Sequence, residues 1–496
     1  MHLRHKFVAF FRNMALYKGN MDVYNYSITS TEVRQMDFER IRSHVPDYRD
    51  FLTVDELNAS TMRLQGEFPD VVRVSEVGRS REGRPIYCLK IGNGSRNALM
   101  FGCQHPNEPI GAMTLEFLTR ELAQDAALRE ELDYTFYVVK CIDPDALTLN
   151  QGWFKGPFEI YHYLRHYYRP AFHEQVAWTF PVDYKRVHFD SPIPETRILM
   201  KLIDELQPAF MYSLHNLGFG GAYWYLTRDI PELYPHFYRC VADMGIPRKL
   251  GEAEVPYATE FAPAVFKLLT VQDEYEYNSR YISEDYAAAH HAYGTFSGDY
   301  ANRAGERTFT FVNELPYFFD PRVSDLSLSD RSRRDAVVES CAYKIRHDED
   351  LRPVYERVLP LIDRADNHFA TALKERMASG TGSIAAQKRW AEENEAFLAK
   401  ATVAQVFDNL LVSRFFQATI TSLLIRACEM EAGRAQDEAA RRTLCEAQAF
   451  AEQYLKDECA YLESHMNYQA IPVKKLVTVQ AECGLRAAQY ISKEKG

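Results

Sequence analysis

Strand-like and helix-like segments alternate along residues 51–324, and this order constrains the fold more than any other feature of the 496-residue chain. Short apolar runs such as NALMFGCQ, DYTFYVVKCI and AFMYSLH are typical of buried strands, whereas PIGAMTLEFLTREL and ETRILMKLIDEL place apolar residues on one helical face. Strand–helix–strand order with apolar strands predicts an α/β domain built on a largely buried sheet.

The character of the chain changes after about residue 327. Residues 330–496 show few strand signals and many amphipathic stretches rich in Ala, Glu, Arg, Lys and Leu. We therefore predict a C-terminal all-α helical bundle over 330–496, with a break at ASGTGS (378–383) and a central or interface helix over the apolar residues 402–427. Residues 1–50 are predicted to be an N-terminal tail and a lead-in to the domain at 51–324.

Charge, cysteine content and hydropathy limit the partners and the compartment. The formal net charge is −11, which argues against a nucleic-acid partner, because such proteins usually carry a basic stripe. Nine scattered cysteines without a CxxC pair predict reduced thiols in a cytoplasmic protein and not a disulfide framework. No run of about 18 apolar residues occurs, so we expect no membrane partner.

A histidine followed three residues later by an acid, His105 and Glu108, stands in the segment GCQHPNEPIG. With 15 histidines and 69 acidic residues among 496 positions, chance gives about two such pairs, and there are two others. Those are His44/Asp47 and His347/Asp350, which lie in polar stretches and are predicted to be solvated. The pair at 105 instead follows an apolar strand and precedes a helix, at the strand end where open α/β sheets build their sites.

Two further strand ends supply the groups that a catalytic zinc site needs. Such a site has three protein ligands and one open position, and two histidines with a glutamate are a known set. His215 ends the strand AFMYSLH; alone it would be interpreted as a core histidine, but with the 105/108 pair it is our third ligand. Glu314 ends the alternating strand in TFTFVNEL, where a carboxylate is costly unless it is paired or functional. We assign it as the acid/base, with a buried ion pair as the alternative.

At these residues the chain resembles the zinc carboxypeptidase family, the funnelin-type metallocarboxypeptidases. GRSREGRPIYCLKIG, HPNE, PVDYKR with PETRIL, SLH and FVNEL match the family's motifs in the same order, over about residues 50–320. The resemblance implies a single twisted mixed sheet flanked by helices, with one zinc ion at its edge.

The resemblance also implies roles for side chains that bind the substrate. Arg186, with Lys185 where the family usually has asparagine, would hold a substrate carboxylate, since an arginine fork binds carboxylates bidentately. Arg169, or failing that Arg165, would stabilise the oxyanion, and Tyr293 would cap the site.

These features predict a zinc-dependent hydrolase that cleaves an amide bond next to a substrate carboxylate, most simply by removing the C-terminal residue of a peptide. The first alternative is an amidase or deacylase of a small N-acyl amino acid or peptide-like metabolite, because Asn107 stands where family peptidases often have arginine. A non-catalytic binding protein is a second alternative, which the complete ligand set disfavours. The helical domain could form a homo-oligomer.

Overall fold

The computed structural model describes residues 36–290 and 293–494. The chain divides into two units, Met1–Asp37 and Phe38–Gly496, and the elements below all belong to the second. Residues 1–35 of the predicted N-terminal tail lie outside the described residues.

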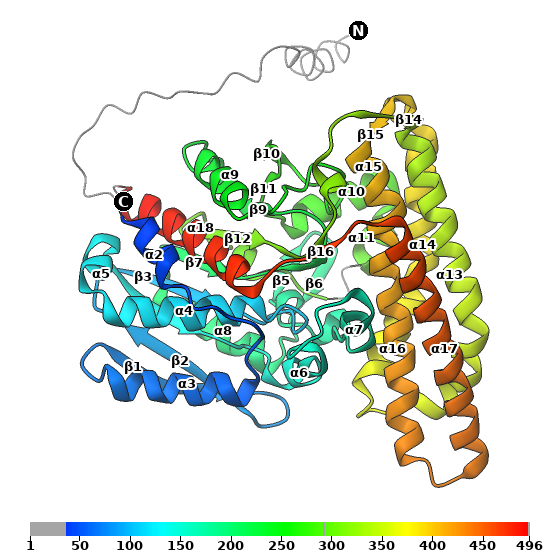
Figure 1. Ribbon diagram of the computed structural model, residues 1–496, viewed down its shortest axis with the longest axis horizontal. Coiled ribbons are helices and arrows are strands. Elements are labelled where there is room, and N and C mark those ends of the chain that lie inside the picture. Colours follow the sequence, from blue (N-terminus) through cyan, green and yellow to red (C-terminus); the bar gives the residue numbers. More distant parts are fainter. Residues whose placement is uncertain (1–35, 291–292, 495–496) are drawn as a thin grey trace. The chain divides into compact units, whose positions relative to one another are not determined.

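A nine-stranded mixed sheet forms the centre of this unit, in the order β1-β2-β4-β3-β7-β12-β9-β11-β10 (Figure 1). Its strands are β1 (Val72–Arg79), β2 (Pro85–Ile91), β3 (Arg96–Phe101), β4 (Tyr134–Val139), β7 (Phe210–Ser213), β9 (Tyr223–Leu226), β10 (Glu260–Ala262), β11 (Val265–Lys267) and β12 (Phe309–Glu314). β3 pairs in parallel with β4 and β7, and β7 pairs in parallel with β12, whereas the pairs β1–β2, β2–β4, β9–β12 and β10–β11 are antiparallel. The predicted α/β fold with a mixed sheet is confirmed.

Helices cover both faces of the sheet, which explains why its central strands are continuous apolar runs. In β3, Leu99 and Phe101 pack in one cluster with Leu199 of α8, while the alternate residues are buried on the other face. The helices of this part are α2 (Phe38–His44), α3 (Val54–Glu67), α4 (Ile110–Gln124), α5 (Ala126–Leu132), α6 (Pro144–Thr148), α7 (Ile160–Arg165), α8 (Pro194–Leu206), α9 (Tyr234–Asp243), α10 (Val271–Tyr281), α11 (Glu284–His290) and α12 (Ser297–Ala301).

Four long helices stand beside the sheet as a separate column (Figure 1). They are α13 (Arg333–Ile362), α14 (His368–Glu393), α16 (Ser413–Arg434) and α17 (Glu438–His465). The predicted C-terminal helical region is thus present. The break expected at 378–383 was wrong, because α14 continues through this stretch. Each glycine costs a helix only about 1 kcal/mol relative to alanine, and the flanking Met377 and Ile384 are buried against the neighbouring helices.

The last helix, α18 (Val473–Lys493), does not join this column but packs along α4 and against β7 and β12 (Figure 1). Gly484 allows this close approach, since a Cβ atom there would lie 2.3 Å from the ring of Tyr212 in β7. The C-terminal segment therefore covers part of the central sheet. Whether residues 51–324 and 330–496 are separate folding domains stays a prediction.

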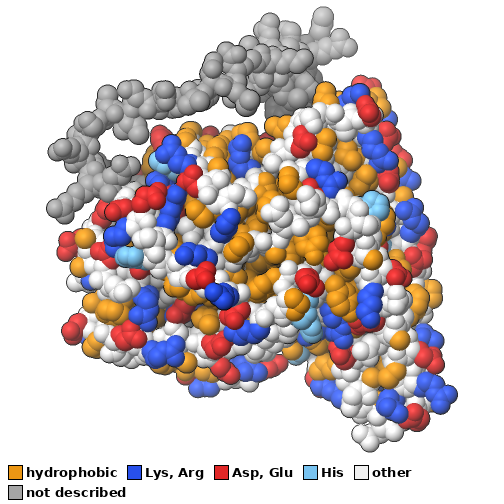
Figure 2. Space-filling model, viewed as in Figure 1, with side chains coloured by type: hydrophobic (Ala, Val, Ile, Leu, Met, Phe, Trp, Pro, Cys, Tyr) orange, Lys and Arg blue, Asp and Glu red, His pale blue; other side chains and the backbone are white. Residues whose placement is uncertain are grey.

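Three short sheets complete the fold. β5 (Val182–Tyr184) and β6 (Val187–Phe189) form a hairpin, β14 (Leu328–Ser332) pairs with β15 (Lys400–Thr402), and β13 (Pro316–Phe319) lies between β8 (Leu217–Phe219) and β16 (Gln469–Ala470). On the face shown in Figure 2, basic and acidic side chains are interspersed.

One helical segment among the described residues, Val403–Arg434, is long and apolar enough to cross a membrane by length and composition alone. It comprises α15 (Val403–Phe407), a π-helical turn and α16, and half of its apolar window is buried in the protein. α16 packs against α13, α14 and α17, which is the position of the central helix expected from the sequence. The expected absence of a membrane partner stays a prediction.

Candidate metal centre

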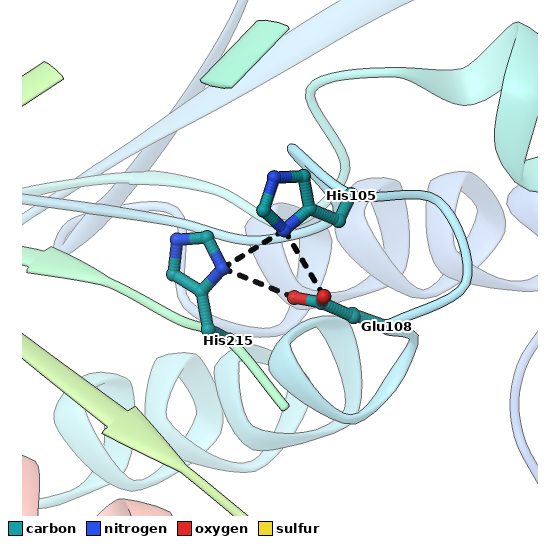
Figure 3. A group of neighbouring side chains, drawn as sticks. All are labelled: His105, Glu108 and His215. Carbon is teal, nitrogen blue, oxygen red and sulfur yellow. Dashed lines mark hydrogen bonds and ion pairs between the residues drawn. The ribbon is translucent and has the colours of Figure 1, made fainter. Parts of the chain in front are cut away.

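The side chains of His105, Glu108 and His215 converge on one point at the carboxyl ends of β3 and β7 (Figure 3). Nδ1 of His105 lies 3.2 Å from Nδ1 of His215 and 3.0 Å from Oε1 of Glu108, and Oε2 of Glu108 lies 3.0 Å from Nδ1 of His215. Ligands about 2.0–2.2 Å from a tetrahedral zinc ion are separated by roughly 3.3–3.6 Å, so these donors are close to the spacing of an occupied site. Two imidazole nitrogens that face each other with a carboxylate between them fit a cation.

Local backbone features bring these three groups together. β3 and β7 are parallel neighbours, so their carboxyl ends meet at one edge of the sheet. Cys103 has a left-handed φ of 61°, which turns the chain sharply between β3 and His105 and is a strain typical of functional sites. Gly111 lets the first turn of α4 approach β7, because a Cβ atom there would lie 2.9 Å from Cβ of Leu214.

Electrostatics keep the donors in the protonation states that a metal needs. Burial, and then the positive charge of Arg169, lowers the pKa of His105 to about 3, so this imidazole is neutral at physiological pH. Burial alone would raise the pKa of Glu108, but His105 and His215 lower it well below its usual range. A neutral imidazole and an ionised carboxylate are the forms that bind zinc.

Neighbouring polar groups fix the orientation of the ligands. Nε2 of His215 lies 3.1 Å from Oγ of Ser213, and a proton on Nε2 leaves the lone pair of Nδ1 for the metal. The backbone N–H of Asn216 donates to Oε2 of Glu108 at 3.2 Å.

Gln480 of α18 is a positioning residue that the sequence analysis missed. Its fully buried amide nitrogen donates to the carbonyl oxygens of His215 (2.6 Å) and Asn313 (3.2 Å), and its amide oxygen accepts from Thr114 at 2.9 Å. It therefore ties together the strand ends that carry His215 and Glu314. The signal available in the sequence was only a glutamine within an amphipathic helical stretch, far from every motif.

Glu314 ends β12, which lies beside β7. Its Oε1 lies 3.9 Å from Nδ1 of His215, and its buried Oε2 has no hydrogen-bond partner among the described residues. Burial and the negative charges of Glu108 and Glu254 raise the pKa of Glu314 well above its usual value. A carboxyl group with a raised pKa that lies beside the metal ligands binds a proton readily and is suited to act as a base.

The structure brings Arg169, and not Arg165, to this centre. Nη2 of Arg169 lies 2.8 Å from Nε2 of His105, and its Nη1 lies 3.5 Å from Oε1 of Glu108. Arg165 instead binds two acidic residues of the helical column, Glu452 at 2.7 Å and Glu429 at 3.0 Å. Of the two arginines predicted to stabilise the oxyanion, Arg169 is the one whose guanidinium lies beside the candidate metal ligands.

Lys185 and Arg186 lie at the exposed tip of the β5–β6 hairpin, with side chains 44% and 52% exposed. Lys185 forms an ion pair with Glu276 of α10, and Nη1 of Arg186 lies 2.8 Å from Oδ1 of Asp285 in α11. Their contacts are with these helices and not with the metal ligands, so the predicted role in substrate binding receives no support from the geometry.

Tyr293 is buried in an aromatic cluster, stacked 5.0 Å from the ring of Phe172 and edge-on to Trp178 at 5.7 Å. Burial, and then the charge of Glu274, raises the pKa of its hydroxyl. Its assignment as a cap of the site stays a prediction.

The other two histidine–acid pairs do not form metal sites. Nδ1 of His44 lies 3.0 Å from Oε2 of Glu121, and its side chain is 43% exposed. The expectation that His347 is solvated was wrong, because it is buried in α13 with its Nε2 3.0 Å from Oγ1 of Thr421 in α16. Within the part of the chain that the structure describes, His105, Glu108 and His215 are the group of three that could hold a metal.

Parts of this chain are similar to known carboxypeptidases. Carboxypeptidase B of Astacus astacus is 31% identical over 104 residues, which cover 20% of this chain and 34% of that protein. Zinc carboxypeptidase A 1 of Anopheles gambiae is 31% identical over 147 residues, 25% of this chain and 34% of that protein. The chain thus spans about a third of the length of these curated relatives.

Among solved structures, the carboxypeptidase A from Helicoverpa armigera matches with 15% identity and a TM-score of 0.35 over 54% of this chain and 65% of that one. The murein-tripeptide amidase from Escherichia coli O157 matches with 16% identity and a TM-score of 0.26 over 50% of this chain and 88% of that one. The model of the zinc carboxypeptidase family matches residues 57–316, just over half of the chain and the whole segment that carries His105, Glu108, His215 and Glu314. This chain belongs to the zinc carboxypeptidase family.

Proposed function

We propose that this protein is a zinc-dependent metallopeptidase that hydrolyses the amide bond next to a substrate carboxylate, and so removes the C-terminal residue of a peptide. The observation that carries the proposal is the convergence of two Nδ1 atoms and one carboxylate beside the unpartnered Oε2 of Glu314. Metal ligands alone would fit a storage or structural site. A buried base beside them fits hydrolysis.

Each group has a defined part in the reaction. Zinc, when bound by His105, Glu108 and His215, would acidify a water molecule and polarise the carbonyl of the scissile amide. Glu314 takes the proton from the attacking water and then gives it to the leaving amine, for which its raised pKa is suited.

Arg169 would hold the negative charge that develops on the carbonyl oxygen. When Nδ1 of neutral His105 faces the metal, its proton stays on Nε2, so Nε2 and the nearby Nη2 of Arg169 are both donors. Two donors do not bind each other, so Nη2 is available to the substrate, while Nε of Arg169 donates to Oε1 of Gln175 at 3.0 Å and holds the guanidinium in place. An arginine in such a position contributes about 3 kcal/mol to the transition state.

A second candidate is an amidase or deacylase of a small N-acyl amino acid, which would use the same residues on another substrate. Asn107 favours it, because this buried amide next to Glu108 replaces the arginine expected of a peptidase.

We also infer a cytoplasmic location from the nine cysteines, all of which are described and free of disulfides.

The test combines metal analysis with a panel of C-terminally varied peptides and N-acyl amino acids. We expect about one zinc ion per chain, hydrolysis of substrates with a free carboxylate, and a loss of kcat of at least about 100-fold in Glu314→Gln with the zinc retained. Glu306→Gln, an exposed change shortly before β12, is the matched control and should leave kcat unchanged. Unchanged activity in Glu314→Gln would overturn the proposal, and faster turnover of N-acyl amino acids than of peptides would favour the second candidate.

A further inference from the structure

Arg376 of α14 belongs to the helical column and lies outside the family-matched residues 57–316, yet it reaches the surroundings of the metal centre. Its guanidinium stacks on the ring of Phe172, 5.0 Å from the centroid. Phe172 follows Arg169 by three residues and stacks on Tyr293. A cation from a distant part of the sequence is thus added to the segment that carries the arginine of the active centre.

The charge of Arg376 has no ion-pair partner among the described residues. Its guanidinium makes no hydrogen bond within this part of the chain and lies on the ring of Phe172. The adjacent acid, Glu375, is engaged elsewhere, since its Oε2 accepts from the backbone N–H of Phe172 and its Oε1 lies 3.8 Å from Nδ1 of His173. Leaving a guanidinium partly buried without an anion is costly.

A second positive charge lies close by. Burial lowers the pKa of Arg376 and the charge of Arg169 lowers it further, while Tyr167 and Glu375 partly offset this. Burial raises the pKa of Tyr167 and the charges of Arg169 and Arg376 lower it, so both arginines lie near this tyrosine. Two neighbouring cations, one of which has no ion-pair partner among the described residues, form a site for an anion.

Both arginines are only partly buried. Part of the surface of Arg376 remains exposed to solvent, and the side chain of Arg169 is 22% exposed. By contrast, Arg186, to which the family resemblance assigns the binding of the substrate carboxylate, is already paired with Asp285.

We propose that Arg376 binds the carboxylate of the substrate, so that the helical column completes the specificity site of the metal centre. The inference rests on the proposed function and deepens it. It assigns to the helical region a part in substrate selection, in place of the hairpin that carries Arg186. The aromatic rings of Phe172 and Tyr293 beside the guanidinium favour a substrate whose last residue is apolar.

The test is a binding measurement that does not depend on turnover. In the zinc-loaded full chain with Glu314→Gln, calorimetry measures Kd for N-acetylglycyl-phenylalanine and for its C-terminal amide. Arg376→Met keeps the packing on Phe172 but removes the charge. We expect it to weaken binding of the free acid by about 10–100-fold, which is the range for a hydrogen bond to a charged group, and to leave binding of the amide within about twofold. Arg376→Lys should restore part of the loss.

Two control variants separate this role from a general effect of charge. Lys374→Ala removes an exposed lysine of α14 that is paired with Asp363, and Arg186→Ala removes the competing arginine. Neither should change the preference for the free acid. An equal loss for acid and amide in Arg376→Met, or no loss for either, would overturn the inference. Failure of hydrolysis by the unmodified chain would instead overturn the proposed function, and binding by Arg376 would still be measured.

Discussion

At the scale of single residues, the sharpest distinction in this protein is between Arg169 and Arg165, which are four residues apart in the sequence. Arg169 contacts His105 and Glu108, whereas Arg165 contacts Glu429 and Glu452 of the helical column. Identical side chains therefore lie in different surroundings, one beside the candidate metal ligands and one against the helical column.

Substituting these arginines should separate the two roles. Arg169→Met removes the donor for the oxyanion, so we expect kcat to fall by about 100–1,000-fold while KM changes little and zinc is retained. Arg165→Met should keep kcat and lower the unfolding temperature instead. Steady-state kinetics, metal analysis and a thermal melt of each variant check this. A normal kcat in Arg169→Met would remove it from the mechanism.

The candidate metal ligands could be predicted from the sequence because their evidence is local. His105 and Glu108 are three residues apart and follow an apolar strand, and His215 and Glu314 each end such a strand. The groups that the sequence did not reveal, Gln480 and Arg376, reach the centre only through packing between segments more than 200 residues apart.

At the scale of elements, α18 combines two tasks, because it covers the sheet and holds the strand ends of the active centre. The amide of Gln480 binds two strand-end carbonyls, and the hydroxyl of Tyr212 donates to its backbone carbonyl at 3.0 Å. A helix assigned by sequence to the bundle therefore acts on the metal site. The amphipathic pattern of α18 predicted a helix but could not tell which apolar surface it would cover.

Gln480→Leu should weaken zinc binding without unfolding the chain. Leucine fills a similar volume but leaves the carbonyls of His215 and Asn313 without this donor, and loss of a group that orients a ligand typically costs 10–100-fold in metal affinity. We expect a loss of about that size in competition with a chelator, together with a lower kcat. Gln489→Leu on the same helix, whose amide binds Glu131, is the control and should leave zinc affinity unchanged. Unchanged zinc affinity in Gln480→Leu would show that α18 covers the sheet without supporting the metal site.

At the scale of the whole molecule, the sequence predicts a boundary near residues 325–330, where strand signals end. The structure shows why such a boundary need not separate two folding units. Residues 38–496 form one compact unit, α18 returns to the sheet, and Arg165 and Arg426 bind groups across the junction with the helical column. A change in composition marks a change in secondary structure, whereas cooperativity depends on contacts that only the folded chain reveals.

Zinc should therefore stabilise the helical column as well as the sheet. A ligand that binds only the folded state adds about 2.7 kcal/mol at a free concentration 100 times its Kd, and a cooperative unit shares this gain throughout. Hydrogen exchange measured near the unfolding midpoint should show equal zinc-dependent protection in peptides from β7 and from α16 and α17. His215→Ala, which lacks one ligand, should lose the zinc effect in both regions. If zinc protects β7 but leaves α16 and α17 unchanged, the column folds independently and the predicted division into domains holds.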